Sequence, residues 1–374
     1  MTTARRVAGT AARWLEEGRR VVAALLVQID GSAPLDLGAR MLVTEDGQVE
    51  GSITGGCVEA AVVREAMAIF AGGNARLVAY GISDELAGSV GLTCGGTVHI
   101  FVHELRGEAA ALEARAGEAA EAGEAVAVAT LLDGPGAGRK LLVRNGAAAG
   151  SLGGPELLDH SVARDAEGIL ADGHSRTRRY SRDGATLGAE LTVHVTAYGA
   201  APKMLIFGAI DFAAALASLA SELGYEVIIS DPRRAFLNAP HFRRAAMTLV
   251  GWPEAAFEQV DVGPRDAVLV LSHDPKLDRP ALLGALATQV GYIGALGSRR
   301  TTADRNRRLL ESGVGEEGLA RVNAPCGLDI GSATPEEVAV SILAEIIAKR
   351  SGRPGMPLRD SAGSIHRRRL AGQR

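Results

Sequence analysis

The chain of 374 residues is longer than one hydrophobic core usually serves, so two or three domains are expected. Its apolar fraction of 47% is typical of a globular protein, and a net charge of −4 gives no reason to expect a nucleic-acid or anionic-membrane partner. Three cysteines are too few for a disulfide framework, and no apolar run approaches the roughly 20 residues of a membrane helix. The charged N-terminal stretch predicts an amphipathic helix rather than a signal peptide, and the expected location is the cytoplasm.

The first third of the chain predicts a small mixed α/β unit. Glycine-rich loops at Gly51–Cys57 and Gly91–Gly96 separate apolar runs of strand and helix period. The predicted strands are Val21–Ile29, Arg40–Thr44, Ala75–Tyr80 and Thr97–Val102, and the predicted helices after the N-terminal one are Val58–Phe70 and Gly107–Ala122.

The next stretch resembles a degenerate copy of the same unit, offset by about one hundred residues. The matching segments are Leu25–Gly31 with Val128–Gly134, Gly38–Val43 with Gly138–Val143, and Thr97–Ile100 with Thr192–Val195. The second copy has Pro155 where the first has Cys57, and it lacks the loop that carries Cys94. We therefore expect the first copy to be active and the second to be structural.

From Lys203 onward, short apolar strands alternate with helices, which indicates a Rossmann-like, doubly wound parallel sheet. The last residues are polar and basic. The predicted fold is α/β, with domains at 1–105, 106–200 and 201–350 followed by a flexible tail at 351–374.

A dinucleotide fingerprint belongs between the first strand and helix of this sheet, where Gly208 stands. Asp231 ends the second strand, where a carboxylate usually holds ribose hydroxyls. However, Ile210 occupies the position where the backbone must approach a pyrophosphate, and Asp211 adds negative charge beside it. A nucleotide-binding site and a nucleotide fold without a nucleotide both remain open.

Two other segments follow strands of the same sheet, at the edge where ligands of such folds collect. His273 and Asp274 follow the fourth strand, and Arg299 and Arg300 follow the fifth at the start of a helix. Paired arginines beside free helix amides are typical of a phosphate site, whereas the alternative is that they are solvated surface charges. The histidine has a structural alternative as well.

Cys57 follows Gly55 and Gly56 at a predicted helix N-terminus, where free amides and the helix dipole favour a thiolate. We expect the glycine amides to form a concavity for a bound anion, with Glu59 capping the helix. Cys94 lies in a similar loop before Gly95 and Gly96, and a small core residue is the alternative for either cysteine. Their spacing is not that of zinc ligands, so no metal site is predicted.

At these residues the chain resembles the XdhC/CoxI family, the accessory proteins of xanthine dehydrogenase and related molybdenum hydroxylases. The resemblance covers most of the chain. It is carried by Gly38–Arg40, Gly55–Glu59, Leu92–Gly96, Ser272–Pro275, Gly297–Arg300, Gly327–Gly331 and Thr334–Ile342.

The resemblance implies a maturation factor, rather than a turnover enzyme, that binds molybdenum cofactor (molybdopterin), shelters it during sulfuration and assists its insertion into a client hydroxylase. Cys57 and Cys94 are then the catalytic candidates for contact with the cofactor or its sulfur. The candidate cofactor-binding residues are Arg40, Gly55, Gly56, Gly95, Gly96, Gly208, Asp231, His273, Asp274, Arg299 and Arg300. A cysteine desulfurase is a further candidate partner, and a homodimer is compatible with the sequence.

Many family members carry a nucleotide fingerprint with histidine after the second glycine, and Ile210 and Asp211 replace those residues here. The departure argues against NAD(P). Two alternatives to the cofactor chaperone are an NAD(P)-dependent oxidoreductase and a non-catalytic scaffold that docks a client hydroxylase. The expected site is a cleft between the first unit and the carboxyl edge of the parallel sheet.

Overall fold

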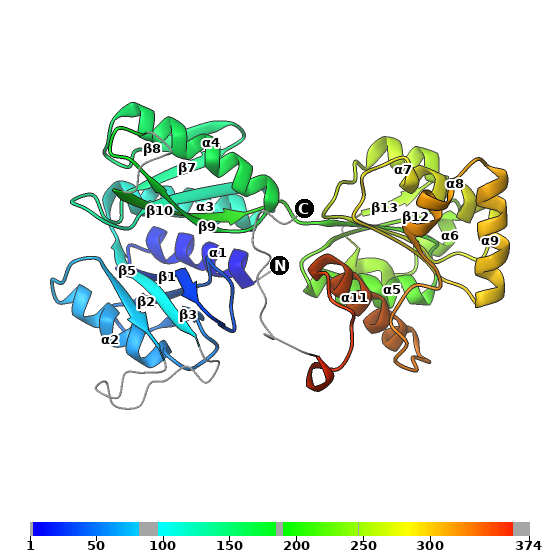
Figure 1. The fold of residues 1–374 in the computed structure, drawn as a ribbon, viewed down its shortest axis with the longest axis horizontal. Coiled ribbons are helices and arrows are strands. Elements are labelled where there is room, and N and C mark those ends of the chain that lie inside the picture. The colour runs from blue at the N-terminus through cyan, green and yellow to red at the C-terminus, as the bar shows by residue number, and fades with distance from the viewer. Residues whose placement is uncertain (1–2, 82–95, 185–189, 246, 362–374) are drawn as a thin grey trace. The chain divides into compact units, whose positions relative to one another are not determined.

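The computed structural model describes residues 3–81, 96–184, 190–245 and 247–361. The chain forms two compact units, the first from Thr2 to Ala200 and the second from Ala201 to Ala362 (Figure 1). No helix in the described part of the chain is both long and apolar enough to cross a bilayer.

The first unit contains two five-stranded sheets with the same strand order, β3-β2-β1-β5-β4 and β8-β7-β6-β10-β9. Neighbouring strands in both sheets are antiparallel. The elements of the first repeat are α1 (Thr3–Glu16), β1 (Val21–Asp30), β2 (Arg40–Thr44), β3 (Val49–Gly51), α2 (Glu59–Phe70), β4 (Arg76–Tyr80) and β5 (Thr97–Leu105). Those of the second repeat are α3 (Gly107–Glu121), β6 (Val126–Leu131), β7 (Lys140–Arg144), β8 (Ala147–Gly150), α4 (Glu156–Asp172), β9 (Arg176–Tyr180) and β10 (Leu191–Tyr198). The predicted duplication is confirmed.

Each sheet of the first unit is covered on both faces. Helix α2 packs on the outer face of the first sheet and α4 on that of the second, while α1 and α3 lie together between the two sheets (Figure 1). The first seven residues of β1, 21–27, are therefore apolar without alternation, because water reaches neither side of that stretch. The two middle helices approach closely at Gly117, where a Cβ atom would stand 2.3 Å from the carbonyl oxygen of Ala8.

The second unit is a six-stranded parallel sheet of order β13-β12-β11-β14-β15-β16, in which the strand order reverses between β11 and β14. This is the doubly wound Rossmann arrangement, as predicted. Helices α5 and α11 cover one face, and α7, α8 and α9 cover the other (Figure 1). The strands are β11 (Lys203–Phe207), β12 (Glu226–Asp231), β13 (Met247–Val250), β14 (Ala267–Val270), β15 (Tyr292–Ala295) and β16 (Val322–Asn323). The helices are α5 (Asp211–Glu222), α6 (Arg234–Leu237), η1 (Pro240–Arg244), α7 (Pro253–Gln259), α8 (Pro275–Leu286), α9 (Arg299–Glu311), α10 (Glu316–Ala320), α11 (Pro335–Ser351) and η2 (Leu358–Asp360).

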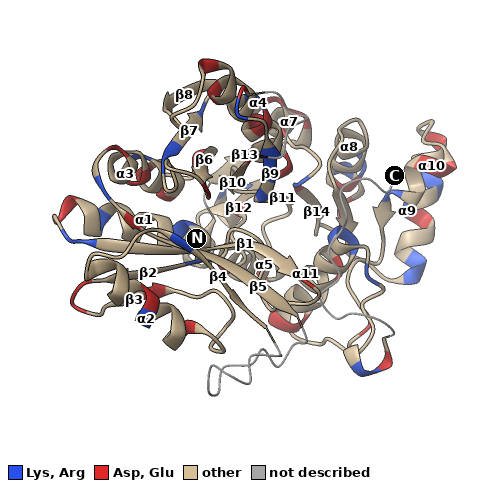
Figure 2. Ribbon diagram, turned by 60° about the vertical axis from the view of Figure 1, so that its left-hand side comes forward, with Lys and Arg blue, Asp and Glu red and all other residues tan. Residues whose placement is uncertain are grey.

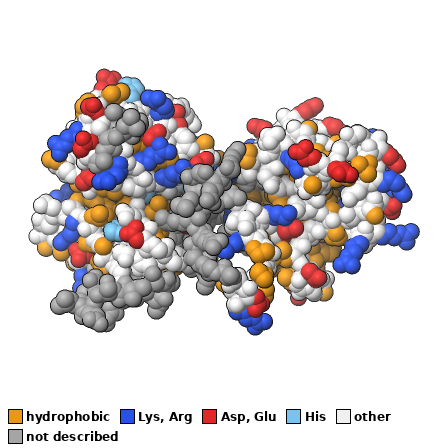
Figure 3. Space-filling model, in the orientation of Figure 1, with side chains coloured by type: hydrophobic (Ala, Val, Ile, Leu, Met, Phe, Trp, Pro, Cys, Tyr) orange, Lys and Arg blue, Asp and Glu red, His pale blue; other side chains and the backbone are white. Residues whose placement is uncertain are grey.

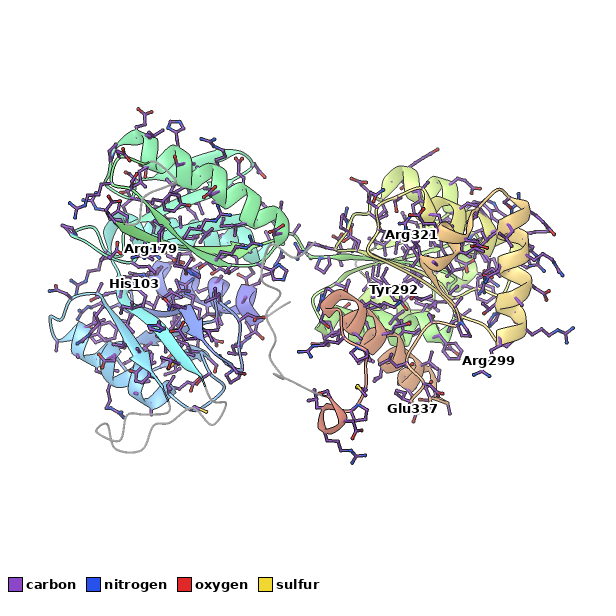
Figure 4. All side chains as sticks on the ribbon, viewed as in Figure 1. His103, Arg179, Tyr292, Arg299, Arg321 and Glu337 are labelled. Atoms are coloured by element: carbon purple, nitrogen blue, oxygen red, sulfur yellow. The ribbon has the colours of Figure 1, made fainter. Side chains whose placement is uncertain are left out.

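Caps set where the helices of the second unit begin. Helix α8 starts at Pro275, because the Asp274 side chain accepts a hydrogen bond from the amide of Lys276 and proline suits the first helical turn. Ser298 caps α9 in the same way. Thr334 and Glu337 form a reciprocal capping box at the start of α11, with Glu337 labelled in Figure 4.

Candidate functional site

The loops that carry the candidate residues of the first repeat leave the first sheet at one end. In the strand register, Asp30 at the end of β1 pairs with Thr97, and Tyr80 pairs with Val98. Gly51, at the end of β3, pairs with Met41 near the start of β2. The Cys57 turn and both ends of the segment that carries Cys94 therefore emerge at the same end of the sheet. Cys94 and Gly95 themselves lie outside the described residues.

The turn before α2 wraps around the carboxylate of Glu59. Oε1 accepts hydrogen bonds from the Ser52 hydroxyl at 2.6 Å and from the amides of Ile53 and Thr54 at 3.2 and 2.9 Å. Oε2 accepts from the amides of Gly56 at 2.9 Å and Val58 at 3.1 Å, and from the Thr54 hydroxyl at 3.0 Å. The amide of Gly55 donates to Ser52 Oγ at 2.9 Å.

The expectation that the glycine amides stand open for an external anion is wrong, because Glu59 supplies an internal one. The concavity forms as predicted, since Gly55 and Gly56 have φ angles of 78° and 125°. Burial alone would raise the pKa of Glu59, but the hydrogen bonds from Ser52, Thr54 and Ile53 outweigh burial and lower it to about 2. The carboxylate is therefore charged at neutral pH and fastens the turn.

The second repeat keeps a simpler version of this turn. Asp159 accepts from the amide of Leu152 at 2.9 Å, and the amide of Gly153 donates to Ser151 Oγ at 3.0 Å. Pro155 stands at the helix start of this copy. The backbone fastening is thus common to both repeats, whereas the thiol belongs to the first.

Cys57 is half-buried and packs against the apolar cluster beneath α2. The space beside the two preceding glycines is open, because a Cβ atom at Gly55 or Gly56 would meet nothing within 4 Å. Gly96 is in a different situation, since a Cβ there would stand 2.2 Å from the carbonyl oxygen of Ser32. Its lack of a side chain lets the strand start against the loop after β1.

Arg40 lies inside the first unit, away from solvent. Its guanidinium forms an ion pair of 2.9 Å with Glu113 on α3 and a hydrogen bond of 3.1 Å to the Tyr198 hydroxyl. Burial would lower the pKa of this arginine, but Glu113 and Tyr198 outweigh burial and raise it. These contacts across the repeats account for the arginine of the Gly38-Ala-Arg motif in structural terms.

In the second unit, the turn after β11 is closed by protein atoms. Gly208 has a φ angle of 109°, and a Cβ there would stand 3.0 Å from the amide nitrogen of Ser272. The amide of Ala209 donates to Asp231 Oδ2 at 2.8 Å. Arg233 holds the same carboxylate through Nε at 2.9 Å and Nη2 at 2.8 Å. Burial would raise the pKa of Asp231, but the hydrogen bonds from Arg233 and Ala209 lower it.

Two of the four remaining candidates meet in a pocket of ≈190 Å³ between α8 and α9, which His273 and Arg300 line. Asp274 serves as the cap of α8 and Arg299 is exposed at the start of α9 (Figure 4), and neither lines the pocket. Sequence reasoning missed Arg279, Arg305 and Arg308, which also line it. Helical spacing along α9 places 300, 304 and 308 on one side and could have indicated Arg308.

Cys326, the third cysteine, lies in the interior of the second unit. It is half-buried against Gly294 and the cluster around α5 and α11. Burial, and then the nearby charge of Glu345, raise the pKa of its thiol to about 12. Tyr292, labelled in Figure 4, donates to Glu345 Oε2 at 2.5 Å in the same region. This placement is that of a structural residue.

These features define a class of two-part α/β protein, with a cysteine on a carboxylate-fastened turn in a duplicated first unit and a Rossmann sheet in the second. The model of the XdhC and CoxI family matches residues 14–81 and 119–181, and that of the XdhC Rossmann domain matches residues 204–346. The chain belongs to the XdhC/CoxI family.

Relatives align along most of the chain. A probable xanthine dehydrogenase subunit from Bacillus subtilis is 27% identical over 90% of this chain and 95% of the relative. The molybdenum cofactor insertion chaperone PaoD of Escherichia coli is 28% identical over 90% of this chain and 85% of its own length. A crystal structure described as a xanthine dehydrogenase from Bacillus halodurans shares the fold, with a TM-score of 0.72 and 24% identity over 96% of this chain and 98% of the other.

Proposed function

We propose that the chain binds molybdenum cofactor, protects it during sulfuration and assists its insertion into a molybdenum hydroxylase of the xanthine dehydrogenase or CO dehydrogenase type. Family membership and the alignment with PaoD support this role. The observation that carries it is the position of Cys57, half-buried beside open space on a turn that Glu59 holds in place.

The residues of the first repeat suit the cofactor in two respects. A cysteine sulfur is a soft ligand of the kind that binds metal–sulfur centres. Gly55 and Gly56 leave room for a flat ligand to approach the main chain, because a Cβ at either position would project into open space. When bound, the cofactor supplies the metal centre that the client hydroxylase needs.

Each candidate in the first repeat then has a defined part. Cys57 contacts the cofactor or its sulfur, and we propose the same role for Cys94, with Gly95 and Gly96 beside it. Glu59 positions the Cys57 turn and does not itself face the ligand, because its two carboxylate oxygens accept hydrogen bonds from within the turn. A cysteine desulfurase is the proposed source of sulfur.

The NAD(P)-dependent alternative has less support from the contacts around Gly208. The Ala209 amide, which would approach a pyrophosphate, donates to Asp231, and the Asp231 carboxylate is already bound by Arg233. Asp211 adds a negative charge in the first turn of α5. A scaffold without a ligand remains the second alternative, and the following experiment distinguishes it.

The test is co-expression of the full chain with a client hydroxylase in a cofactor-producing host. Pterin and molybdenum are measured on the purified chain, and activity and sulfuration are measured on the client. We expect retained pterin in the native chain. The double variant Cys57→Ala, Cys94→Ala is expected to lower client sulfuration.

Cys326→Ala is the matched control, because this thiol is interior to the second unit. This variant should leave the retained pterin and the client sulfuration unchanged. Repeated absence of pterin from a chain that still co-purifies with the client would support the scaffold instead. Unchanged client sulfuration in the double variant would show that the two thiols have no part in sulfuration.

A further inference from the structure

The pocket between α8 and α9 is rich in arginine. Arg279 from α8 and Arg300, Arg305 and Arg308 from α9 line it, against two carboxylates, Asp278 and Asp304. Figure 2 shows basic segments along α9. Figure 3 shows Lys and Arg side chains gathered at the edge of the second unit where α9 lies. A volume of ≈190 Å³ is smaller than the roughly 300–1,000 Å³ of sites for whole drug-sized ligands. It suits one small charged group.

The positive charge of the pocket is largely uncompensated. Across the described ranges of the chain, no carboxylate lies within 4.0 Å of the guanidinium nitrogens of Arg279, Arg300 or Arg308. Asp304 pairs instead with Arg307, which lies outside the pocket lining, at 3.1 Å. Burial raises the pKa of Asp278, although Arg305 opposes the shift.

Arg305 is the buried donor of the pocket. Its side chain is only 5% exposed, and Nη2 donates to the carbonyl oxygen of Leu296 at 2.6 Å and to Asp278 Oδ2 at 3.3 Å. Nε and Nη1 have no hydrogen-bond partner among the described atoms. Unsatisfied N–H groups of a buried cation are costly, so a nearby site for an acceptor is expected.

The start of α9 adds to the attraction for an anion, in contrast to the start of α5. Gly297 has a φ angle of 144°, which side chains other than glycine rarely adopt, so the loop before α9 relies on glycine. Ser298 caps the helix and no acidic residue lies in its first turn. Helix α5, at the first strand of the same sheet, begins instead with Asp211. The positive end of the helix dipole can therefore attract an anion at α9, whereas at α5 the charge of Asp211 opposes that attraction.

We propose that the α8–α9 pocket binds the terminal phosphate of a phosphate monoester, with Arg300 and Arg308 at its mouth, Arg279 opposite and Arg305 at its base. Guanidinium groups match the geometry and the double charge of such a phosphate. His273 at the rim adds a further hydrogen-bond donor. The inference uses only residues of the second unit and would stand if the proposed role of the first unit failed.

The test is titration calorimetry of the full chain with inorganic phosphate, glycerol 3-phosphate and AMP at constant ionic strength. We expect saturable binding of all three. Arg308→Gln combined with Arg300→Gln should weaken it by about tenfold or more, as expected for the loss of charge-assisted hydrogen bonds. Arg305→Lys keeps the charge but loses the planar donor pair, and it should also weaken binding.

Arg307→Gln is the matched control, because Arg307 is next to Arg308 on α9 but does not line the pocket. It should change affinity by less than about twofold, through screened charge alone. An AMP affinity about tenfold above that of glycerol 3-phosphate would identify a nucleotide as the source of the phosphate, and equal affinities would show that the pocket recognises the phosphate group alone. No saturable binding up to about 10 mM, or an equal loss in Arg307→Gln, would overturn the proposal.

Discussion

Arg40 and Lys140 stand at matching positions of the two repeats, each as the first residue of its strand, and both form an ion pair with the same carboxylate, Glu113. The distances are 2.9 Å from Arg40 Nη1 to Oε2 and 2.8 Å from Lys140 Nζ to Oε1. All three side chains are buried. The two repeats are thus joined through one acidic residue on the helix between their sheets.

Replacement of Glu113 by glutamine should destabilise the first unit by about 3–5 kcal/mol, because two buried cations would lose their counter-charge. Trp14 fluorescence in a Trp252→Phe background reports on the first unit alone during urea unfolding. Glu118→Gln, on the exposed side of the same helix, should change the free energy of unfolding by less than about 0.5 kcal/mol. Equal effects of the two variants would contradict this account.

The stability of the first unit should fall as the pH drops below about 6.5, because two histidines stay neutral in the fold. Burial, and then the charge of Lys140, lower the pKa of His194 to about 3 and that of His103 well below 6.5. Below about pH 6.5, these two histidines therefore take up protons in the unfolded chain but not in the folded chain. The cost is up to about 1.4 kcal/mol per histidine and pH unit.

Unfolding takes up protons between pH 6.5 and 5, and His103→Phe should reduce that uptake by about one proton. Both ring nitrogens of His103 lack partners among the described atoms, and the ring stacks on Phe101 at 4.9 Å, so an apolar ring is expected to fit (His103 is labelled in Figure 4). The measurement is the free energy of unfolding from urea titrations at several pH values. An unaltered slope in His103→Phe would refute the assignment.

Glu59→Gln should loosen the Cys57 turn, because an amide side chain cannot accept all the hydrogen bonds that the carboxylate accepts. Each charge-assisted bond contributes about 1.5–3 kcal/mol, so the turn should open at least about tenfold more often. The alkylation rate of Cys57 in a Cys94→Ser background measures this opening. Asp159→Asn, in the corresponding turn of the second repeat, should leave that rate unaffected. If both variants accelerate alkylation alike, general destabilisation is the cause.

Ile210→Gly alone should not create NAD(P) binding. The glycine would restore the approach of the backbone, but the Ala209 amide would still donate to Asp231 and Arg233 would still occupy the carboxylate. Fluorescence titration with NADH checks this, with Arg233→Ala added in a second variant. Saturable binding by the single variant would show that Ile210 is the sole obstacle.

The fold could be predicted from the sequence wherever the signal is local and repeated. The strand and helix periods of the two copies and their shared Asp-Gly and Gly-Ser turns indicated the duplication, and alternating strands and helices indicated the Rossmann sheet. The start of α8 is harder to predict, because Pro280 inside the apolar stretch masks the cap at Asp274 and Pro275. Short helices such as α7 and α10 have little sequence signal because they bury few residues.

The candidate site could be predicted only in part. The position of Cys57 on a glycine turn was correct, and a signal for the internal anion was present, since Ser52, Thr54 and Glu59 lie within one short segment. The ion pairs of Glu113 with Arg40 and Lys140 depend on how the repeats pack, and no spacing along the chain indicates them. Arg305 and Asp278 likewise meet only because α8 and α9 pack together.

The internal hydrogen bonding of the Cys57 turn bears on how a bound molecule could leave it. A loop that relies on its ligand for order collapses on release and must re-form for the next one. This turn keeps its own negative charge in place, so we expect its shape to be the same with and without a bound molecule. In the proposed role as a cofactor carrier, release is then opposed only by the direct contacts that are lost, and we expect the empty protein to be ready to bind again.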